Sequence, residues 1–297
     1  SKKEQDNLTQ HKETSMLNRL IFSLLSLMLA ACTTVLTTPV IEPQISEPIA
    51  AWSEILNKFV DNKGRGDFQA LQRDRTALDR YVAYIANTGF DSFPNKDELI
   101  AHHINAYNAL AMWTVLEKGI PITNAGTNKI EFFYNTKMKI GGTVLSLYEY
   151  ENEIIRPLGD ERVHFALNCM AVSCPRLPKT PFTRTHLHQQ LDREARLFFA
   201  EPRNLTVDND SKTVSLSEIL DFYPDDFLKK APSLIAYANI YSVHPIPMSY
   251  EILFFPYDWR INDSSRIQRH SANSAWWAFA KPSSPSTTPR RTKPSPP

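Results

Sequence analysis

The feature that most constrains how this chain can fold is a short apolar run near its beginning. Met16 and the positive charge of Arg19 are followed by residues 20–29, which are apolar except for two serines. A run of about ten residues is typical of a secretory signal, since a helix that spans a bilayer needs about 20 apolar residues. We therefore expect residues 16–31 to be a signal peptide and residues 1–15 to be an over-extended gene start. Neither segment is expected to belong to the folded body.

The signal ends in Leu-Ala-Ala-Cys at residues 29–32, which resembles a bacterial lipobox. The resemblance implies cleavage before Cys32 and transfer of a diacylglyceryl group to its thiol. Three acyl chains, palmitate among them, would anchor the chain far more firmly than one chain can. Because Thr33 follows instead of Asp, the sorting pattern of Gram-negative lipoproteins favours the outer membrane, with the body in the periplasm. Residues 32–50, rich in Thr and Pro, then form a predicted tether.

The other end of the chain has a composition that cannot form a core. Residues 264–297 contain six basic residues, no acidic residue and six prolines, so we expect a disordered tail. Without the two ends the charge changes sign, since residues 32–263 hold 23 Lys and Arg against 29 Asp and Glu, a formal charge of −6. An acidic body argues against nucleic acid as a partner. Residues 51–263 have the size of one ordinary domain.

Hydrophobic periodicity predicts that the first third of this domain is helical. Apolar side chains recur at helical spacing over residues 52–60 and 78–85. A longer helix is expected to begin near Asn95 and to stop at Gly119, where Pro121 also follows.

Strand signals dominate the rest of the domain. A Gly pair at residues 141–142 predicts a tight hairpin, and Ser146 with Glu149 forms a capping-box signature, which residues 215–218 repeat. Further strands are expected at residues 162–168, 204–207, 213–214 and 252–257, and a further helix around residues 187–199. Helices and strands come in blocks without βαβ alternation. We therefore expect an α+β fold, a single domain with a helical N-terminal third and a small, mainly antiparallel sheet.

Polar residues within apolar segments are the first candidates for a site. Asn105 and Asn108 lie one turn apart on the long helix, so they either clamp backbone groups or form the wall of a site. Glu151 and Arg156 form either a buried ion pair or part of a binding pocket. The adjacent His102 and His103 are more often surface or satisfied side chains than metal ligands.

The segment from His164 to Pro175 is the chemical focus, because Cys169 and Cys174 are the only cysteines besides Cys32. In an oxidising compartment two nearby thiols most simply form a disulfide. Alternatively, Cys169 is a nucleophile, although an extended chain would place His164 too far away to activate it directly. A zinc site of His164, Cys169 and Cys174 is the third interpretation, but the spacing is unusual and no fourth ligand is evident.

Four stretches together resemble the domain-of-unknown-function 547 family. They are HHINAYNAL at residues 102–110, LSLYEYENEIIR at 145–156, HFALNCMAVSCPRL at 164–177 and YDW at 257–259. The resemblance spans residues 52–262 and implies no particular activity. Carried over position by position, it marks a set of polar candidates: Asn105, Tyr107, Asn108, Glu151, Arg156, His164, Cys169, Ser173, Cys174, Pro175 and Asp258. His102 and His103 replace an aromatic pair of the family pattern, and Asn152 replaces a His.

Three classes of function remain open. In the first, a polar cleft binds an envelope peptide, glycan or small ligand, and Cys169 is bridged to Cys174. In the second, Cys169 is the nucleophile of a hydrolase for peptide, amide or ester bonds, with a His as base and Asn105 or Asn108 supporting the oxyanion. The candidate catalytic residues are Cys169, His164, Glu151 and Asn105, and the candidate binding residues are Asn108, Tyr107, Arg156, Ser173 and Asp258. A purely structural envelope protein is the third class. No metal or cofactor is expected, since the sequence lacks a Walker loop, a dinucleotide-binding glycine pattern and an HExxH motif.

Overall fold

The computed structural model describes residues 33–41 and 45–266. The chain divides into two compact units, residues 1–34 and 35–297, and the second contains the fold described below. The predicted signal peptide, Cys32 and the tail beyond residue 266 lie outside the described residues, so their assignments remain predictions. Within the described ranges, no helix combines the length and the apolar character that crossing a membrane requires.

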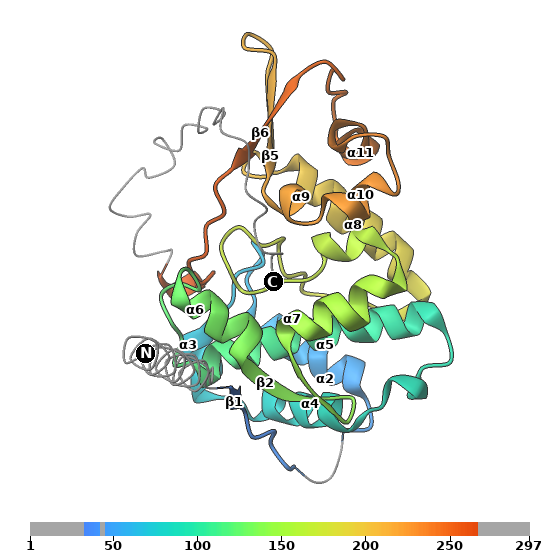
Figure 1. The fold of residues 1–297 in the computed structure, drawn as a ribbon. Helices are drawn as coiled ribbons and strands as arrows, with labels where there is room; N and C mark the ends of the chain where they lie inside the picture. The colour runs from blue at the N-terminus through green and yellow to red at the C-terminus, as the bar shows by residue number, and fades with distance from the viewer. Residues whose placement is uncertain (1–32, 42–44, 267–297) are drawn as a thin grey trace, which may run out of the picture. The chain divides into compact units, whose positions relative to one another are not determined.

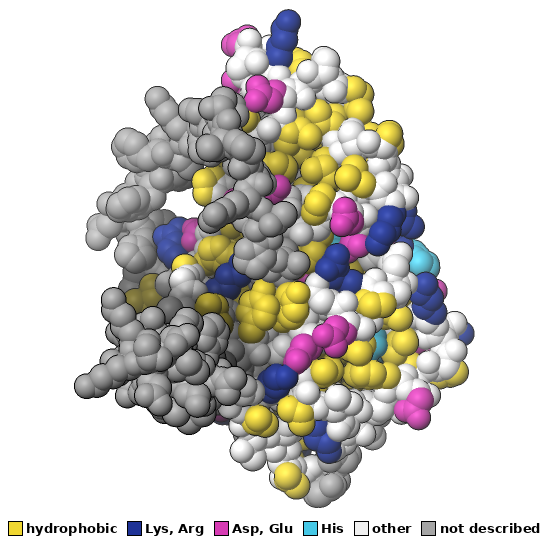
Figure 2. All heavy atoms as spheres, viewed as in Figure 1, with side chains coloured by type: hydrophobic (Ala, Val, Ile, Leu, Met, Phe, Trp, Pro, Cys, Tyr) yellow, Lys and Arg dark blue, Asp and Glu magenta, His cyan; other side chains and the backbone are white. Residues whose placement is uncertain are grey.

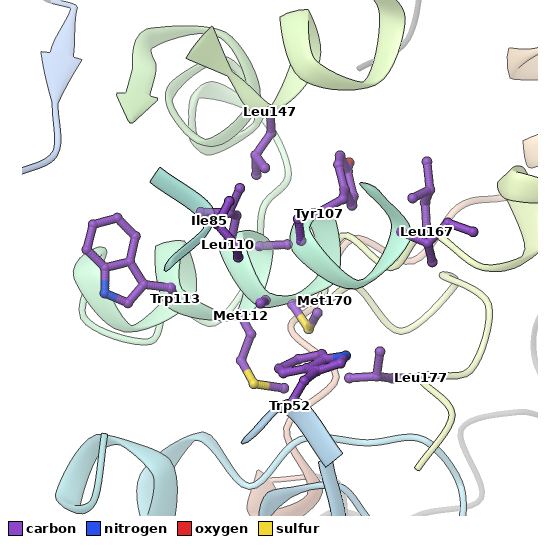
Figure 3. Close-up of a cluster of buried hydrophobic side chains, with 14 of the residues drawn as sticks. Trp52, Ile85, Tyr107, Leu110, Met112, Trp113, Leu147, Leu167, Met170 and Leu177 are labelled. Carbon is purple, nitrogen blue, oxygen red and sulfur yellow. The ribbon is translucent and has the colours of Figure 1, made fainter. Parts of the chain in front are cut away.

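The N-terminal third is helical, as predicted. It contains α2 (Pro48–Phe59), α3 (Phe68–Arg73), α4 (Thr76–Asn87), the 3₁₀ turn η1 (Phe90–Ser92) and α5 (Lys96–Glu117). Asn95 caps α5 by accepting hydrogen bonds from the N–H groups of Asp97 and Glu98, and Gly119 follows the helix end with a φ of 72°. Nearly every side chain of α5 from Ile100 onward is buried, and the helix runs through the middle of a large apolar cluster (Figure 3). A helix buried on all sides is a core element and not a surface helix.

The predicted hairpin is confirmed. β2 (Thr136–Ile140) pairs antiparallel with β3 (Thr143–Ser146) across two glycines with positive φ, after α6 (Thr127–Ile130) and the π-helical turn η2 (Glu131–Asn135). The predicted capping box is present as well, and it starts α7 (Leu147–Glu149), which continues as the π-helical η3 (Tyr150–Ile155) and the 3₁₀ turn η4 (Arg156–Leu158). Beside β1 (Thr34–Val35), the N–H of Leu36 donates to the carbonyl of Lys137 at 2.8 Å. Part of the predicted tether therefore contacts the body.

A second sheet lies in the C-terminal half. β5 (Thr213–Ser217) pairs antiparallel with β4 (Leu205–Asp208) and parallel with β6 (Glu251–Phe255), so the predicted strands are present and one pairing is parallel. The helical elements here are η6 (Arg184–His186), α8 (Leu187–Ala200), α9 (Ile219–Phe222), α10 (Pro224–Leu228) and α11 (Leu234–Tyr241). Figure 1 shows this sheet and α11 at the end of the unit opposite α2 and α4. The predicted α+β fold is confirmed.

Two local predictions are wrong. Residues 162–168 do not form a strand, because residues 161–165 form the 3₁₀ helix η5 (Glu161–Phe165), capped by the Asp160 side chain. Their apolar alternation has another cause: Val163 and Leu167 pack in one buried cluster and Phe165 packs in a second cluster. The predicted capping box at residues 215–218 is also absent, since residues 213–217 belong to β5 and Glu218 instead accepts a hydrogen bond from the N–H of Tyr257.

The two buried clusters organise the unit. The first surrounds α5 and includes Trp52, Trp113 and Met170, and the second gathers aromatic side chains around Phe165 from α8, α10 and α11. In Figure 2, acidic and basic side chains are interspersed on the visible face, with apolar side chains between them. The described residues visible on this face therefore show no continuous basic surface of the kind that nucleic acids bind.

Candidate functional site

A small pocket lies where the loop that carries the two cysteines meets α5, η3, α9 and residues 257–259. Its volume is about 40 Å³. One water molecule needs roughly 10–15 Å³, so the pocket has room for a few waters or for the end of a ligand. We call it the central pocket, and it is lined by Tyr107, Phe133, Glu151, His164, Leu167, Cys169, Cys174, Pro175, Ile219, Phe222, Tyr223, Tyr257 and Trp259.

Glu151 is the buried carboxyl of the central pocket. One of its oxygens accepts a hydrogen bond from the Tyr107 hydroxyl at 2.9 Å, and the other accepts one from the Tyr223 hydroxyl at 2.7 Å. Burial raises the pKa of Glu151 to about 7, although the two tyrosine hydroxyls and the nearby Arg156 act in the opposite direction. A carboxyl with such a pKa is half ionised near neutral pH and can accept or release a proton there.

Glu151 and Arg156 do not form the direct ion pair considered from the sequence. Arg156 directly follows the π-helical turn η3 that carries Glu151, but its Nε lies 2.8 Å from Asp226 Oδ2. The Arg156 guanidinium also lies over the Tyr223 ring, 4.9 Å from its centroid. Arg156 is therefore behind the wall of the central pocket and positions Tyr223 and Asp226.

His164 connects the central pocket to Asp226. Its Nε2 lies 3.0 Å from Asp226 Oδ2, and its ring stacks on Tyr223 with the centroids 4.0 Å apart. Burial lowers the pKa of His164, while hydrogen bonding to His164, Arg156 and Lys229 overcomes the effect of burial and holds the pKa of Asp226 well below its ordinary value. A neutral His164 beside an ionised carboxylate must donate its Nε2–H, which leaves Nδ1 as an acceptor.

Cys169 and Cys174 are both free thiols, so the predicted disulfide is not formed in this structure. The sulfurs are neighbours nevertheless, because the turn at residues 169–174 folds back on itself. Cys174 Sγ accepts hydrogen bonds from the backbone N–H of Cys169 at 3.1 Å and from the Tyr257 hydroxyl at 3.2 Å. These donors satisfy the sulfur without a bridge, and Tyr257 lies 3.6 Å from Cys169 Sγ as well.

The two thiols differ in acidity. Hydrogen bonding to Cys174, together with burial, raises the pKa of Cys169 well above its ordinary value. Burial alone would raise the pKa of Cys174, but hydrogen bonds from Cys169, Tyr257 and backbone N–H groups lower it overall. The pair therefore releases its first proton readily and its second with difficulty, and the developing charge is centred on Cys174. No interaction joins His164 to either sulfur among the described contacts, so the structure offers no direct His activation of Cys169.

Asn105 and Asn108 clamp the backbone, which is the first of the two roles considered for them. Asn105 donates to the carbonyl of Phe182 at 2.8 Å and accepts from the N–H of Phe182 at 2.9 Å. Asn108 donates to the carbonyl of Ala166 at 3.0 Å and accepts from the N–H of Asn168 at 2.7 Å. Both amides are committed, so neither is placed to support an oxyanion in the central pocket, whereas Tyr107 on the same helix does reach it.

The cysteine loop is held in a strained conformation by several clamps. Met170 is a buried non-glycine residue with a φ of 64°, in the left-handed region that costs free energy for such a residue. The Asn168 side chain accepts from the Met170 N–H at 2.7 Å and donates to the Pro175 carbonyl at 2.6 Å, and the N–H of Asn262 donates to the Met170 carbonyl at 2.8 Å. The surrounding contacts thus fix the loop that presents the thiols.

Ser173 and Asp258 have structural contacts in place of the predicted binding role. The Asp258 N–H donates to Ser173 Oγ at 2.9 Å, and the Asp258 carboxylate pairs with Arg260. Neither residue lines the central pocket. Their hydrogen bond instead connects the cysteine loop to the segment that carries Tyr257 and Trp259.

His102 and His103 are buried on α5 outside the central pocket. Burial lowers the pKa of His102 to about 4 and the pKa of His103 to about 3, so both rings are neutral near pH 7. His103 Nδ1 lies 2.7 Å from the Tyr150 hydroxyl, and His102 stacks on Phe93. Both rings therefore pack inside the fold, and His102 Nε2 has no hydrogen-bond partner among the described residues.

Several functional side chains were missed by the sequence analysis. Tyr223 lies just before α10 and Asp226 lies within it, and Phe222, Tyr257 and Trp259 form the aromatic side of the central pocket. Only the Tyr257-Asp-Trp259 stretch carried a signal, and there the middle residue was chosen instead of its neighbours. Tyr223 and Asp226 lie in a segment with no motif, so only the fold reveals them.

Among the described residues, no group of three or more His, Cys, Asp and Glu side chains is arranged to hold a metal ion. His164 is bonded to Asp226, and the cysteines are bonded to Tyr257, so the three residues of the zinc interpretation do not converge on one point.

Comparison with known proteins gives one match. Residues 91–199 match the family model described as Protein of unknown function, DUF547. The matched range includes Tyr107, Glu151, His164 and both cysteines, but it ends before Tyr223 and Tyr257. No curated protein and no solved structure matches the chain.

Proposed function

We propose that this chain is a lipoprotein anchored to the outer membrane through Cys32, and that its domain binds the end of a small envelope ligand in the central pocket. The observation that carries the binding proposal is the convergence of Glu151, His164 and two free thiols on one partly open cavity. These groups come from separate elements of the fold, and their supporting contacts are fixed. The hydrogen bonds among these groups offset the cost of burying them, and ionisable groups with perturbed pKa values that line one cavity are typical of functional sites.

The anchor is tested by cell fractionation. In a Gram-negative host, the full chain should label with palmitate and sediment with the outer membrane, whereas Cys32→Ser should lose the label. Cys169→Ser is the matched control, because it removes a thiol outside the lipobox and should keep the label. A Cys32→Ser chain that still carries palmitate would refute the anchor.

The binding proposal is tested by protection of the pocket thiols. In the anchored chain, Cys169 and Cys174 are the only thiols left for iodoacetamide, so their rate of alkylation reports whether the central pocket is occupied. Amines, amino sugars, neutral sugars, organic acids and short peptides would be added to the detergent-purified chain. A ligand of the pocket should slow alkylation in proportion to its occupancy. A panel in which no compound slows alkylation would refute the binding module.

A cysteine hydrolase is the second candidate, because both thiols are free and Glu151 can exchange a proton near neutral pH in the same cavity. Hydrolysis through Cys169, the less buried of the two cysteine residues, would give an acyl-enzyme and a burst of p-nitrophenol from p-nitrophenyl esters. A burst that Cys169→Ser abolishes would make hydrolysis the leading function. Slow, burst-free release that is equal in both chains would leave the binding module in place.

A further inference from the structure

The hydroxyl hydrogens around the central pocket are already used. Tyr107 and Tyr223 donate theirs to Glu151, and Tyr257 donates its hydrogen to Cys174 Sγ. A tyrosine hydroxyl has one hydrogen, so none of the three has a hydrogen left to donate. The hydroxyls of Tyr107 and Tyr257 therefore offer lone pairs, and not hydrogens, to a ligand that enters the pocket.

The remaining polar groups of the lining offer no hydrogen to the cavity either, since the Cys169 thiol, which keeps its proton, is hydrogen-bonded to Cys174. An ionised Glu151 has no hydrogen to donate, and His164 donates its Nε2–H to Asp226. The lining contains neither Lys nor Arg. Arg156 lies over Tyr223 and donates its hydrogen bonds to Asp226 and Asn152, so it reaches Glu151 through its charge and not through a hydrogen bond. A ligand that matches this wall must bring hydrogen-bond donors, and a positive charge would be complementary to Glu151.

The aromatic side of the central pocket favours a cation as well. Phe133, Phe222, Tyr223, Tyr257 and Trp259 present ring faces or edges to the cavity or its rim. At the rim, the ammonium of Lys129 lies 4.3 Å from the centroid of the Trp259 ring and 5.7 Å from that of Phe222. Aromatic faces attract ammonium groups through their quadrupoles. The chain itself thus shows an ammonium bound to this aromatic cluster.

The volume sets the size of the group. About 40 Å³ admits an ammonium nitrogen with the first carbon or two that carry it, but no ring. The rest of a ligand would have to extend through the opening.

From these observations we infer that the central pocket binds the primary ammonium end of a linear amine, with Glu151 as its counter-ion and the oxygens of Tyr107 and Tyr257 among its hydrogen-bond acceptors. This inference rests on the proposed binding function and specifies its ligand class. Three N–H donors of one ammonium suit a wall of several acceptors, and a quaternary ammonium would leave those acceptors unpaired.

The inference is tested with four butyl compounds that differ only in their head group. Dissociation constants for butylamine, butanol, butyrate and butyltrimethylammonium would be measured on the full chain by protection of the thiols from iodoacetamide. Butylamine should bind at least about tenfold more tightly than the others, because a charge-assisted hydrogen bond contributes more than a neutral one. Butanol binding as tightly as butylamine would overturn the ammonium site and leave a pocket for neutral ligands. If none of the four compounds protects the thiols but another compound of the panel does, the ammonium inference is wrong and the binding function stands. If no compound protects the thiols, both the inference and the binding function are wrong.

Two variants separate the role of Glu151 from general damage to the fold. Glu151→Gln should weaken butylamine about tenfold or more and leave butanol unchanged, since it removes the charge and keeps the size. Glu153→Gln, on the exposed side of the same turn, is the matched control and should bind butylamine like the unchanged chain. In the unchanged chain, butylamine affinity should rise as pH increases through about 7, where Glu151 ionises. An affinity that is flat from pH 6 to pH 8 would contradict the site even if Glu151→Gln does not fold.

The source of the ammonium can be resolved with the same assay. Putrescine represents a free linear amine and Nα-acetyl-lysine amide represents a lysine side chain of a peptide. Protection by either supports the site, and the tighter of the two identifies the source. Glucosamine carries its amine on a ring, so protection by glucosamine equal to that by butylamine would contradict the size of the site.

Discussion

Two regions of the molecule share the helix α5 but use polar side chains in different ways. At Asn105 and Asn108, each amide bonds both the N–H and the carbonyl side of a distant backbone segment. At Tyr107, one residue away from Asn108, the hydroxyl bonds the Glu151 carboxyl, which is itself shared with Tyr223. The first region joins side chain to backbone, and the second joins side chain to side chain beside a cavity.

The difference shows what each region contributes. Amide-to-backbone bonds do not titrate over the ordinary pH range, and they fix where the chain runs. A carboxyl bonded to hydroxyls changes its charge near neutral pH, so its interactions depend on protons and on whatever enters the cavity. We therefore expect the asparagine clamps to control stability and the pocket residues to control pH dependence and reactivity.

The largest effect is expected from Asn108→Ala. This change leaves the Ala166 carbonyl and the Asn168 N–H buried without partners and also opens a small cavity. Each unsatisfied buried group costs about 1–3 kcal/mol, so the free energy of unfolding should fall by roughly 4 kcal/mol. Urea unfolding followed by circular dichroism measures the change.

Asn57→Ala is the matched control for that experiment. Asn57 is an exposed helix residue whose side chain, among the described residues, bonds only Ser53. Its loss should change stability by about 0.5 kcal/mol or less, as for most surface substitutions. Equal losses in the two variants would show that the clamp is no stronger than a local surface bond.

The sequence predicted that Asn105 and Asn108 form hydrogen bonds, but it could not identify the backbone groups that they bond. Two asparagines one turn apart in an apolar helix must be hydrogen-bonded, because burial of an unpaired amide is costly. The sequence could not give the partner segments, since Phe182 and Ala166 lie 77 and 58 residues away along the chain. Local patterns also failed at residues 162–168, where apolar alternation serves two different cores and not one face of a sheet.

The next effect concerns Glu151 and the pH dependence of stability. The pKa of Glu151 is raised from 4.5 to about 7 on folding, so between these values the folded chain holds a proton that the unfolded chain has lost. The contribution of Glu151 to the free energy of unfolding therefore falls as pH rises from about 4.5 to about 7. Below and above this range the contribution does not change with pH. The difference corresponds to about 3 kcal/mol.

Glu151→Gln isolates this contribution from other titrating groups. His164, whose pKa is lowered by burial, works in the opposite direction, but it is present in both chains and cancels in the comparison. The unchanged chain should lose about 3 kcal/mol relative to Glu151→Gln between pH 4.5 and pH 7.5. A constant difference across this range would mean that Glu151 titrates like an exposed carboxyl.

The sequence predicted only some of the residues that form the central pocket. Tyr107, Glu151, His164 and the cysteines were found as candidates, and the structure brings them to one cavity. Tyr223, Tyr257 and Asp226 were missed, because an aromatic or acidic residue in an ordinary segment carries no local sign of what it will meet. The sequence also proposed three site residues that do not line the pocket: Asn105, Ser173 and Asp258. In sequence, a motif residue that holds a backbone segment in place cannot be told from one that lines the site.

The smallest expected effect, and the most specific to the thiols, is that of Tyr257→Phe. The Tyr257 hydroxyl donates to Cys174 Sγ at 3.2 Å and helps to lower its pKa. Removing the hydroxyl should raise the pKa of the thiol that ionises first and slow iodoacetamide labelling at pH 7 by about tenfold, the effect of about one pKa unit. The labelling rate is followed by intact mass.

Tyr250→Phe is the control, because its hydroxyl bonds Asn209 on the exposed surface and contacts neither sulfur. Its labelling rate should equal that of the unchanged chain. Faster labelling in Tyr257→Phe would mean that the hydroxyl shields the sulfurs and does not promote ionisation, so the thiol pair would have to be a structural part of the loop, like the asparagine clamps. Slower labelling in Tyr257→Phe alone would show that ionisation controls the reactivity of the thiols. The cysteines would then resemble Glu151, whose charge changes with pH, and not the asparagine clamps.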